Sequence, residues 1–425
     1  MTPALIILQS YMIQEENFMK KKALSLFLAV GLCLGLAACG SSAGTSAGSS
    51  SDASKSASAA STSSSAASAS KSESEGASSA GSGTASTASG LPSLTKDTIK
   101  IGFIYGSSIG TEGYTYSHDL GRLALEAEGI QTMYIENVPE TEECEKAAED
   151  LIAQGCNVIY AISFGHGDYI ANVADKHPEV YFNHATGYIN KANMSTYAGR
   201  YYEAQYLAGI AAAMKTESNQ IGYVTTFPIP EVVRQVNSFT LGARSVNPDV
   251  TVSVKWTSSW YDPATEKAAA TELINSGCDI ISAYCDTLNP QMTAQENNCF
   301  AIGCSSPGYE TIPKAYLTAP MVDWAAYYTM DVASILDGTW TGENRWLGMA
   351  DGIVVLDTLS ENCAEGTEEA VDTAKKAIID GSLDVWAGEI KDNEGNVKVA
   401  EGKTLSDEEL LALDWFVEGV IGSVN

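Results

Sequence analysis

The sequence has 425 residues, 45% of them hydrophobic and 18% charged, and its 53 acidic and 24 basic side chains give a formal net charge of −29. A chain of this length can bury a large core and divide into two lobes. A strongly acidic surface repels phosphate backbones and anionic lipid headgroups. This argues against a nucleic-acid-binding protein and against a protein that docks on membranes through a basic patch.

The first 39 residues predict an export signal with a lipid attachment site. Lysines at 20–22 precede an apolar run over 23–38 that is too short for an ordinary transmembrane helix. The run ends in Leu-Ala-Ala-Cys, which resembles a bacterial lipoprotein cleavage site and implies a lipid on Cys39. Residues 1–18 fit no part of a signal, so Met19 is a candidate start. A plain secretion signal is the alternative.

Residues 40–96 predict a flexible tether. From 40 to 90 the chain has no aromatic residue and no Val, Ile, Leu or Met, and it is nearly all Ser, Ala, Gly and Thr. Such a segment cannot bury enough apolar surface to offset its ordering entropy. A coil of about 50 residues spans roughly 40 Å, enough to hold a folded domain over 97–425 away from a membrane.

The remainder alternates apolar strands with amphipathic helices, a pattern typical of parallel sheets covered on both faces. Residues 147–159 resemble residues 267–281, and both stretches read as helix, glycine and strand. We therefore predict an α/β protein with two doubly wound lobes and a ligand cleft at the carboxyl ends of their strands. The predicted helices include 117–128 and 142–154, and the predicted strands are 99–105, 131–135, 158–162, 180–182, 221–225, 252–256, 280–284, 300–302 and 316–317.

The cysteines and histidines do not predict a metal site or a cofactor. Seven cysteines follow Cys39, an odd number with no CxxC spacing, and none of the four histidines has metal-site spacing with another His or Cys. Cys156 and Cys278 occupy the same place in the two similar stretches, just before apolar strands. We interpret them as small apolar core residues rather than metal ligands or disulfide partners.

Several phrases between Ile99 and Asp351 resemble, in order, the basic membrane protein (BMP) family of ABC-transporter substrate-binding lipoproteins. The matching phrases are Gly113–Arg122, Asn183–Tyr188, Thr196–Ala204, Phe227–Arg234, Thr240–Arg244, Trp260–Pro263, Leu317–Pro320 and Leu336–Trp340.

This resemblance implies a type I periplasmic-binding-protein fold whose lobes are joined by three crossings. Lobe 1 is expected over about 97–198 with a segment near 301–320, and lobe 2 over about 199–300 with later segments. It also implies a monomer, anchored by its lipid on the extracytoplasmic face, that binds a purine nucleoside or free base without chemistry. The ligand is then delivered to the permease subunits of an ABC importer.

Two aromatic residues match family positions that stack against the ligand. Tyr114 follows the first strand, and Trp260 follows the strand at 252–256, so they are expected in different lobes. Closure of the cleft would place a flat base between them, and such stacking is worth about 1–3 kcal/mol per base. The alternative is that each ring packs only on its own lobe.

Polar recognition of the ligand edge is expected from Asp286, which follows the strand at 280–284 and matches a ligand-contacting family position. A carboxylate suits ribose hydroxyls or purine N–H groups, whereas the alternative is a helix N-cap. The further candidates, which follow other strands, are Ser107, Ser108, Phe164, Asp323 and Trp324.

The chain departs from nucleoside-binding family members at two positions. The loop Gly303–Pro307 carries no acid where those members have an aspartate, and a lysine that they have near Val322 is absent. A free base such as adenine is therefore as well supported as a nucleoside.

Two other function classes stay open. A ligand-sensing surface receptor or an adhesin would share the same sequence features. A nucleoside-processing enzyme is disfavoured because the sequence contains no HExxH or P-loop motif, and Gly106–Gly113 lacks the GxGxxG order.

Overall fold

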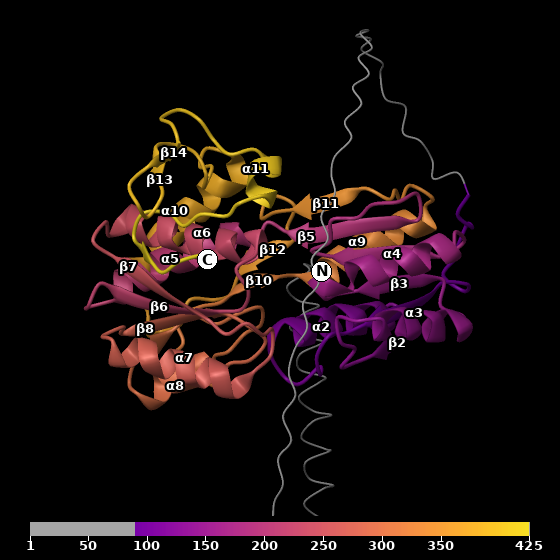
Figure 1. Cartoon of the computed structure of the whole chain (residues 1–425), viewed down its shortest axis with the longest axis horizontal. Coiled ribbons are helices and arrows are strands. Elements are labelled where there is room, and N and C mark those ends of the chain that lie inside the picture. The colour runs from indigo at the N-terminus through magenta and orange to yellow at the C-terminus, as the bar shows by residue number, and fades with distance from the viewer. Residues whose placement is uncertain (1–89, 425) are drawn as a thin grey trace, which may run out of the picture. The chain divides into compact units, whose positions relative to one another are not determined.

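A computed structural model describes residues 90–424, and within them the predicted α/β architecture with two parallel sheets is confirmed (Figure 1). The expected signal, the lipid attachment site at Cys39 and nearly all of the tether lie outside the described residues. No helix of residues 90–424 has the length and apolarity needed to cross a membrane.

Lobe 1 is built on a six-stranded sheet in the order β11-β5-β4-β3-β1-β2, with every neighbouring pair parallel. Helices α2 and α9 pack on one face, and α3 and α4 pack on the other. The elements are β1 (Lys100–Ile104), α2 (Gly113–Ala127), β2 (Gln131–Ile135), α3 (Glu143–Ala153), β3 (Val158–Ala161), α4 (Gly167–Lys176), β4 (Tyr181–Ala185), β5 (Met194–Gly199), α9 (Trp324–Leu336) and β11 (Asn344–Leu347).

Lobe 2 is built on a five-stranded parallel sheet in the order β15-β7-β6-β8-β9. Helices α5 and α6 cover one face, while α7 and α8 cover the other. The elements are α5 (Tyr202–Lys215), β6 (Gln220–Thr225), α6 (Pro230–Val246), β7 (Thr251–Trp256), α7 (Pro263–Asn275), β8 (Ile280–Tyr284), α8 (Asn289–Glu296), β9 (Phe300–Ala301) and β15 (Val420–Ile421).

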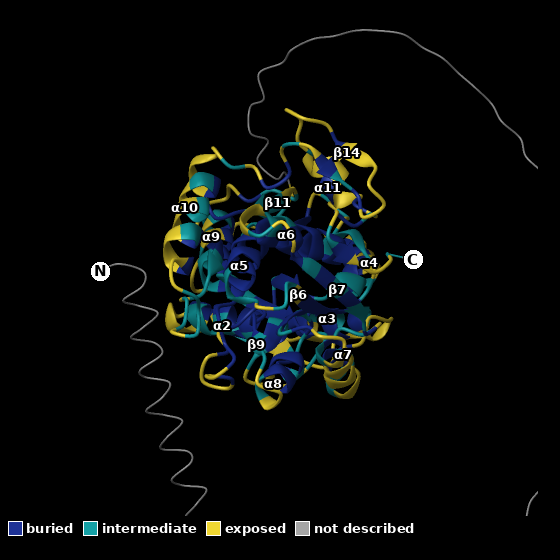
Figure 2. Cartoon of the chain, turned by 90° about the vertical axis from the view of Figure 1, so that its left-hand side faces the viewer, coloured by how far each residue is buried: buried dark blue, intermediate teal, exposed yellow. Residues whose placement is uncertain are grey.

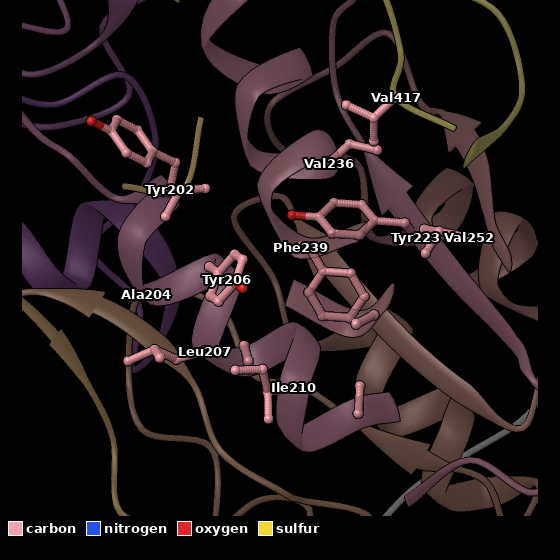
Figure 3. Packing of buried hydrophobic residues seen from close by; sticks show 14 of the residues in the cluster. Tyr202, Ala204, Tyr206, Leu207, Ile210, Tyr223, Val236, Phe239, Val252 and Val417 are labelled. Carbon is pink, nitrogen blue, oxygen red and sulfur yellow. The ribbon is translucent and has the colours of Figure 1, made fainter. Parts of the chain in front are cut away.

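The core of lobe 2 lies between this sheet and the helices α5 and α6. Figure 3 shows Tyr223 of β6 beside Phe239 of α6, and their ring centroids are 5.5 Å apart. Figure 2 shows buried residues on the strands and exposed residues on the outer sides of helices such as α7. Burial on both faces explains why the strands read as continuous apolar runs in the sequence.

The chain crosses between the lobes three times. It passes from β5 into α5, from β9 through β10 (Pro320–Val322) into α9, and from β11 through β12 (Val354–Leu356) into α10 (Thr367–Asp380). Strands β10 and β12 pair antiparallel, so two of the crossings are hydrogen-bonded to each other.

One part of the expected lobe assignment is wrong. Residues 301–320 were expected in lobe 1, but Ala301 extends the sheet of lobe 2 and Tyr316 packs in the same cluster. The segment that returns to lobe 1 is 324–347, where α9 packs on the α2 side and β11 extends the sheet. Short apolar runs predict strands, but they do not specify the sheet that each strand joins.

A C-terminal segment is attached to lobe 2. It contains α10, β13 (Ile390–Lys391), β14 (Val397–Val399), α11 (Asp407–Leu411) and β15. The ring of Phe416 stacks on Trp256 at 6.0 Å, and β15 pairs with β7. The Arg200 guanidinium, at the first crossing, donates to both Asp407 carboxylate oxygens at 2.8 and 2.6 Å.

Helices α5 and α6 approach closely because each has a glycine at the contact. A Cβ atom on Gly209 would lie 2.0 Å from the Phe239 carbonyl oxygen, and one on Gly242 would lie 1.9 Å from that of Tyr206. Neither distance is compatible with a side chain, so only glycine permits this approach.

We predict that Gly242→Ala lowers the free energy of unfolding by about 1–3 kcal/mol, because the added methyl group overpacks the helix contact. Urea unfolding followed by circular dichroism measures the change, with Thr271→Ala on the exposed side of α7 as the surface control. A urea midpoint for Gly242→Ala equal to that of the wild type would contradict the prediction, because it would show that α5 and α6 can move apart without loss of stability.

Candidate functional site

A cavity of about 400 Å³ lies between the two lobes, at the carboxyl ends of their strands. Its wall is formed by the segments that follow β1, β2, β3 and β4 in lobe 1 and β6, β7, β8 and β9 in lobe 2. This is where doubly wound sheets bind ligands, and the volume falls within the usual range of ligand pockets.

Six of the eight residues predicted to contact a ligand line this cavity. They are Ser107, Ser108, Tyr114, Phe164, Trp260 and Asp286. The first four belong to lobe 1 and the last two to lobe 2, so the structure brings together positions up to 179 residues apart in sequence.

The other two predicted residues, Asp323 and Trp324, do not line the cavity. Asp323 is the N-cap of α9, where its Oδ1 accepts a hydrogen bond from the Ala326 N–H at 3.0 Å. Trp324 is 4% exposed and stacks on His118 with the ring centroids 4.0 Å apart. Both residues stabilise the position of α9 on lobe 1, and neither is part of the candidate site.

The rings of Tyr114 and Trp260 reach the cavity from different lobes. The Tyr114 hydroxyl donates to the Ile162 carbonyl oxygen at 2.9 Å, and its ring contacts the edge of His118 at 4.4 Å. Trp260 packs against Phe227, which also lines the cavity, at 5.2 Å. Each ring is therefore held by its own lobe while remaining part of the cavity wall.

Asp286 joins the two lobes at the cavity wall. Its Oδ2 accepts a hydrogen bond from the Ser107 hydroxyl at 3.1 Å, and its N–H donates to the Trp260 carbonyl oxygen at 3.0 Å. Asp286 is not a helix N-cap, because α8 begins at Asn289 and its N-cap is Leu288. Burial raises the pKa of Asp286 to about 7, with a smaller contribution from Glu266 and an opposing one from the Ser107 hydrogen bond.

The lobes also touch beside the cavity, at the start of α2. The Gly113 N–H donates to the Ser306 hydroxyl at 2.9 Å, and the Glu112 Oε1 accepts from the Leu288 N–H at 3.3 Å. Gly113 has a φ of 84°, and a Cβ there would lie 2.4 Å from the Asp286 carbonyl oxygen. A side chain at this position would hold the lobes apart.

The cavity also contains acidic residues that the sequence analysis did not select. Glu231, in the first turn of α6, accepts a hydrogen bond from the Tyr284 hydroxyl at 2.7 Å, and burial raises its pKa. Glu140 accepts from the Ser163 hydroxyl at 2.7 Å and from the Gly165 N–H at 2.8 Å. Glu231 lies within the family-like phrase Phe227–Arg234, so its place after a strand could have indicated a role.

Backbone strain is concentrated at the cavity. Within residues 90–424, six residues other than glycine have a positive φ, and four of them line the cavity: Asn137, Thr186, Ser258 and Ser305. Thr186, with a φ of 53°, is β-branched and pays the largest steric cost in this conformation. Strained backbone that the surrounding structure enforces is typical of functional sites.

The described residues contain no group of three or more His, Cys, Asp or Glu side chains arranged to hold a metal ion. All seven cysteines between 90 and 424 have free thiols, and Cys285 and Cys304 lie in the cavity wall.

We predict that Asp286→Asn stabilises the protein at pH 8 and gives a smaller gain at pH 4. The folded carboxyl has a pKa of about 7, whereas an unfolded Asp titrates near 3.9, so only the folded state holds this proton at intermediate pH. The contribution of the protonated Asp286 to the free energy of unfolding is therefore lost as the pH rises from about 4 to 7. Asn does not titrate, so the variant keeps its stability over this range.

Melting temperatures of both proteins between pH 4 and pH 8 test this expectation. Asp323→Asn makes the same chemical change outside the cavity and is the matched control. A gain for Asp286→Asn that does not grow with pH would contradict the assignment of a buried, protonated carboxyl.

Comparison with known proteins places the chain among transport receptors. Residues 98–383 match the model of the Bmp family, described as PnrA-like ABC transporter substrate-binding proteins. A purine-binding protein of Brucella abortus (strain 2308) is 37% identical over 328 residues, which cover 76% of this chain and 93% of that protein.

Two further similar proteins are a putative sugar-binding transport protein and a solved structure with the same fold. A putative ABC transporter glucose-binding protein of Haloferax volcanii is 37% identical over 342 residues, covering 80% of this chain and 84% of the relative. A solved ABC transporter solute-binding protein of Aeropyrum pernix K1 superposes with a TM-score of 0.60 at 17% identity, over 73% of this chain and 97% of its own.

Proposed function

The chain belongs to the Bmp family of PnrA-like ABC transporter substrate-binding proteins, and on this premise we propose that it binds a purine-type ligand between its lobes. The ligand is a nucleoside or a free base, and it is released unaltered to the permease of an ABC importer. The protein acts on the extracytoplasmic face, attached by a lipid on Cys39.

One observation carries this proposal: Tyr114 and Trp260, from opposite lobes, are both part of the wall of a single cavity. Aromatic rings that approach from two sides suit a flat heterocycle, because each face of the ligand gains a stacking partner. The polar groups beside them, with Asp286 and Ser107 foremost, suit the edge of such a ligand.

The loop that lacks the family aspartate does not distinguish between a free base and a nucleoside as the ligand. Cys304 and Ser305 of this loop line the cavity, and neither is an acid. The ribose contact that an aspartate would supply there is missing, which supports a free base as strongly as a nucleoside.

A sugar is the second candidate ligand. It is favoured by the 37% identity to the putative glucose-binding protein, and an aromatic wall with neighbouring carboxylates also suits a pyranose. Isothermal titration of the whole chain with adenine, adenosine, guanosine and glucose separates the two candidates. Tight binding of glucose alone would overturn the purine proposal.

Deletion of the gene distinguishes transport from sensing or adhesion, because loss of ligand uptake is expected only for a transport protein. A receptor or adhesin would leave uptake of the ligand unchanged. Recovery of a chemically altered ligand after incubation with the protein would instead indicate an enzyme.

We predict that Trp260→Ala weakens purine binding by about 1–3 kcal/mol, because the base loses a stacking partner in lobe 2. Titration calorimetry measures the change, and Tyr309→Ala, which removes an aromatic ring outside the cavity, is the control. Equal affinities for wild type and Trp260→Ala would remove this residue from the binding site.

We predict that Cys39→Ser abolishes attachment to the membrane, because the thiol that would carry the lipid is lost. Partition between detergent and aqueous phases after expression in a bacterial host measures attachment. Cys33→Ser, within the same apolar run, is the matched control. A Cys39→Ser protein that still enters the detergent phase would rule out this cysteine as the anchor.

A further inference from the structure

The charged side chains in the cavity wall are all acidic. Glu140, Glu231 and Asp286 line it, whereas no Lys, Arg or His does. The nearest basic side chain along α6 is Arg234, which interacts electrostatically with Glu231 but does not line the cavity. Its Nη1 donates to the Leu410 carbonyl oxygen at 2.7 Å, and its guanidinium lies 5.0 Å from the Trp346 ring centre.

Glu231 and Asp286 keep unused hydrogen-bonding capacity. The Tyr284 hydroxyl donates to Glu231 Oε1, and the Thr186 side chain is a second partner of Glu231. The Ser107 hydroxyl donates to Asp286 Oδ2. At pH 8 the Asp286 carboxyl, whose pKa is about 7, is mostly ionised. An ionised carboxylate can accept about four hydrogen bonds and a protonated one keeps part of that capacity, so each group has room for donors that a ligand supplies. Acceptor sites that stay unfilled in a partly buried wall are costly when a ligand excludes water from them, which favours a ligand that brings N–H groups.

Glu140 differs from these two groups. It is exposed, and its Oε1 already accepts both the Ser163 hydroxyl and the Gly165 N–H. It adds negative charge to the cavity without the same buried, underused acceptors, so selectivity is expected from the other two carboxylates.

We propose that Glu231 and Asp286 are a pair of specificity-determining acceptors that select amino-bearing ligands without phosphate. The inference rests on the proposed function and narrows its ligand class. An amino group on the ring donates to a carboxylate, whereas an oxo group at the same position presents a second acceptor and repels it. A phosphate group would bring further negative charge to a wall without cations.

Calorimetry at pH 8, where Asp286 is mostly ionised, tests the proposal with the whole wild-type chain and without any variant. Adenosine is compared with purine riboside, which lacks the amino group and adds no other N–H group, and with adenosine 5′-monophosphate. We expect the monophosphate to bind roughly 100-fold more weakly than adenosine, and purine riboside at least about 10-fold more weakly. Equal affinity for adenosine and its monophosphate would overturn the proposal.

Variants assign the selectivity to the two carboxylates. Glu231→Gln and Asp286→Asn keep the shape of each side chain and remove its charge, and each should reduce the preference for adenosine over purine riboside by about 10-fold. Glu361→Gln, outside the cavity, makes the same chemical change as a control. Unchanged preferences in both cavity variants, with wild-type circular dichroism spectra, would overturn the assignment.

Failure of the purine proposal gives a different result. If the wild type binds sugars and no purine, glucosamine, glucose and glucose 6-phosphate form the equivalent set. A preference for glucosamine that Glu231→Gln and Asp286→Asn reduce would support the acceptor pair although the purine function fails. No preference for the amino sugar would overturn both.

Discussion

The hydrogen bond from Ser107 to Asp286 is the contact on which the arrangement of the cavity depends. It joins the end of β1 in lobe 1 to the end of β8 in lobe 2, and Asp286 is tied in turn to the backbone of Trp260. Burial in the cavity wall raises the pKa of the Asp286 carboxyl to about 7, although the Ser107 hydrogen bond opposes this shift. The raised pKa lowers the free energy of unfolding at neutral pH, while the carboxyl group supplies hydrogen-bond acceptors to the cavity wall. Such a loss of stability is typical of functional sites.

The sequence predicted most of the fold because both sheets are parallel and buried on both faces. β2 and β8 are found at the predicted residues, and the strands at 220–225 and 251–256 differ from prediction by one residue at one end. The prediction failed for pairing between distant segments. β11 extends the sheet of lobe 1 after a long excursion through lobe 2, and no local pattern in its four residues indicates that partner.

The site residues could be predicted from the sequence where they lie after the carboxyl ends of strands. Trp260 and Asp286 lie in the loops after β7 and β8, Tyr114 lies at the start of α2, the helix that follows β1, and all three line the cavity. Trp324 also follows a strand, β10, but this strand belongs to a crossing between the lobes and not to either large sheet. Its position after a strand therefore did not place it at the cavity. Glu231 was missed because a carboxylate in the first turn of a helix is also explained by the helix dipole.

The last strand has a consequence for the behaviour of incomplete chains. β15 pairs with β7 at the edge of the lobe 2 sheet, where the Val252 N–H donates to the Gly419 carbonyl oxygen at 2.9 Å. A chain that ends before these residues leaves β7 with unpaired backbone groups and uncovers Trp256. Such an open, apolar edge is a template for intermolecular strand addition, so proteolytic clipping of the C-terminus would favour aggregation over a soluble, shortened receptor.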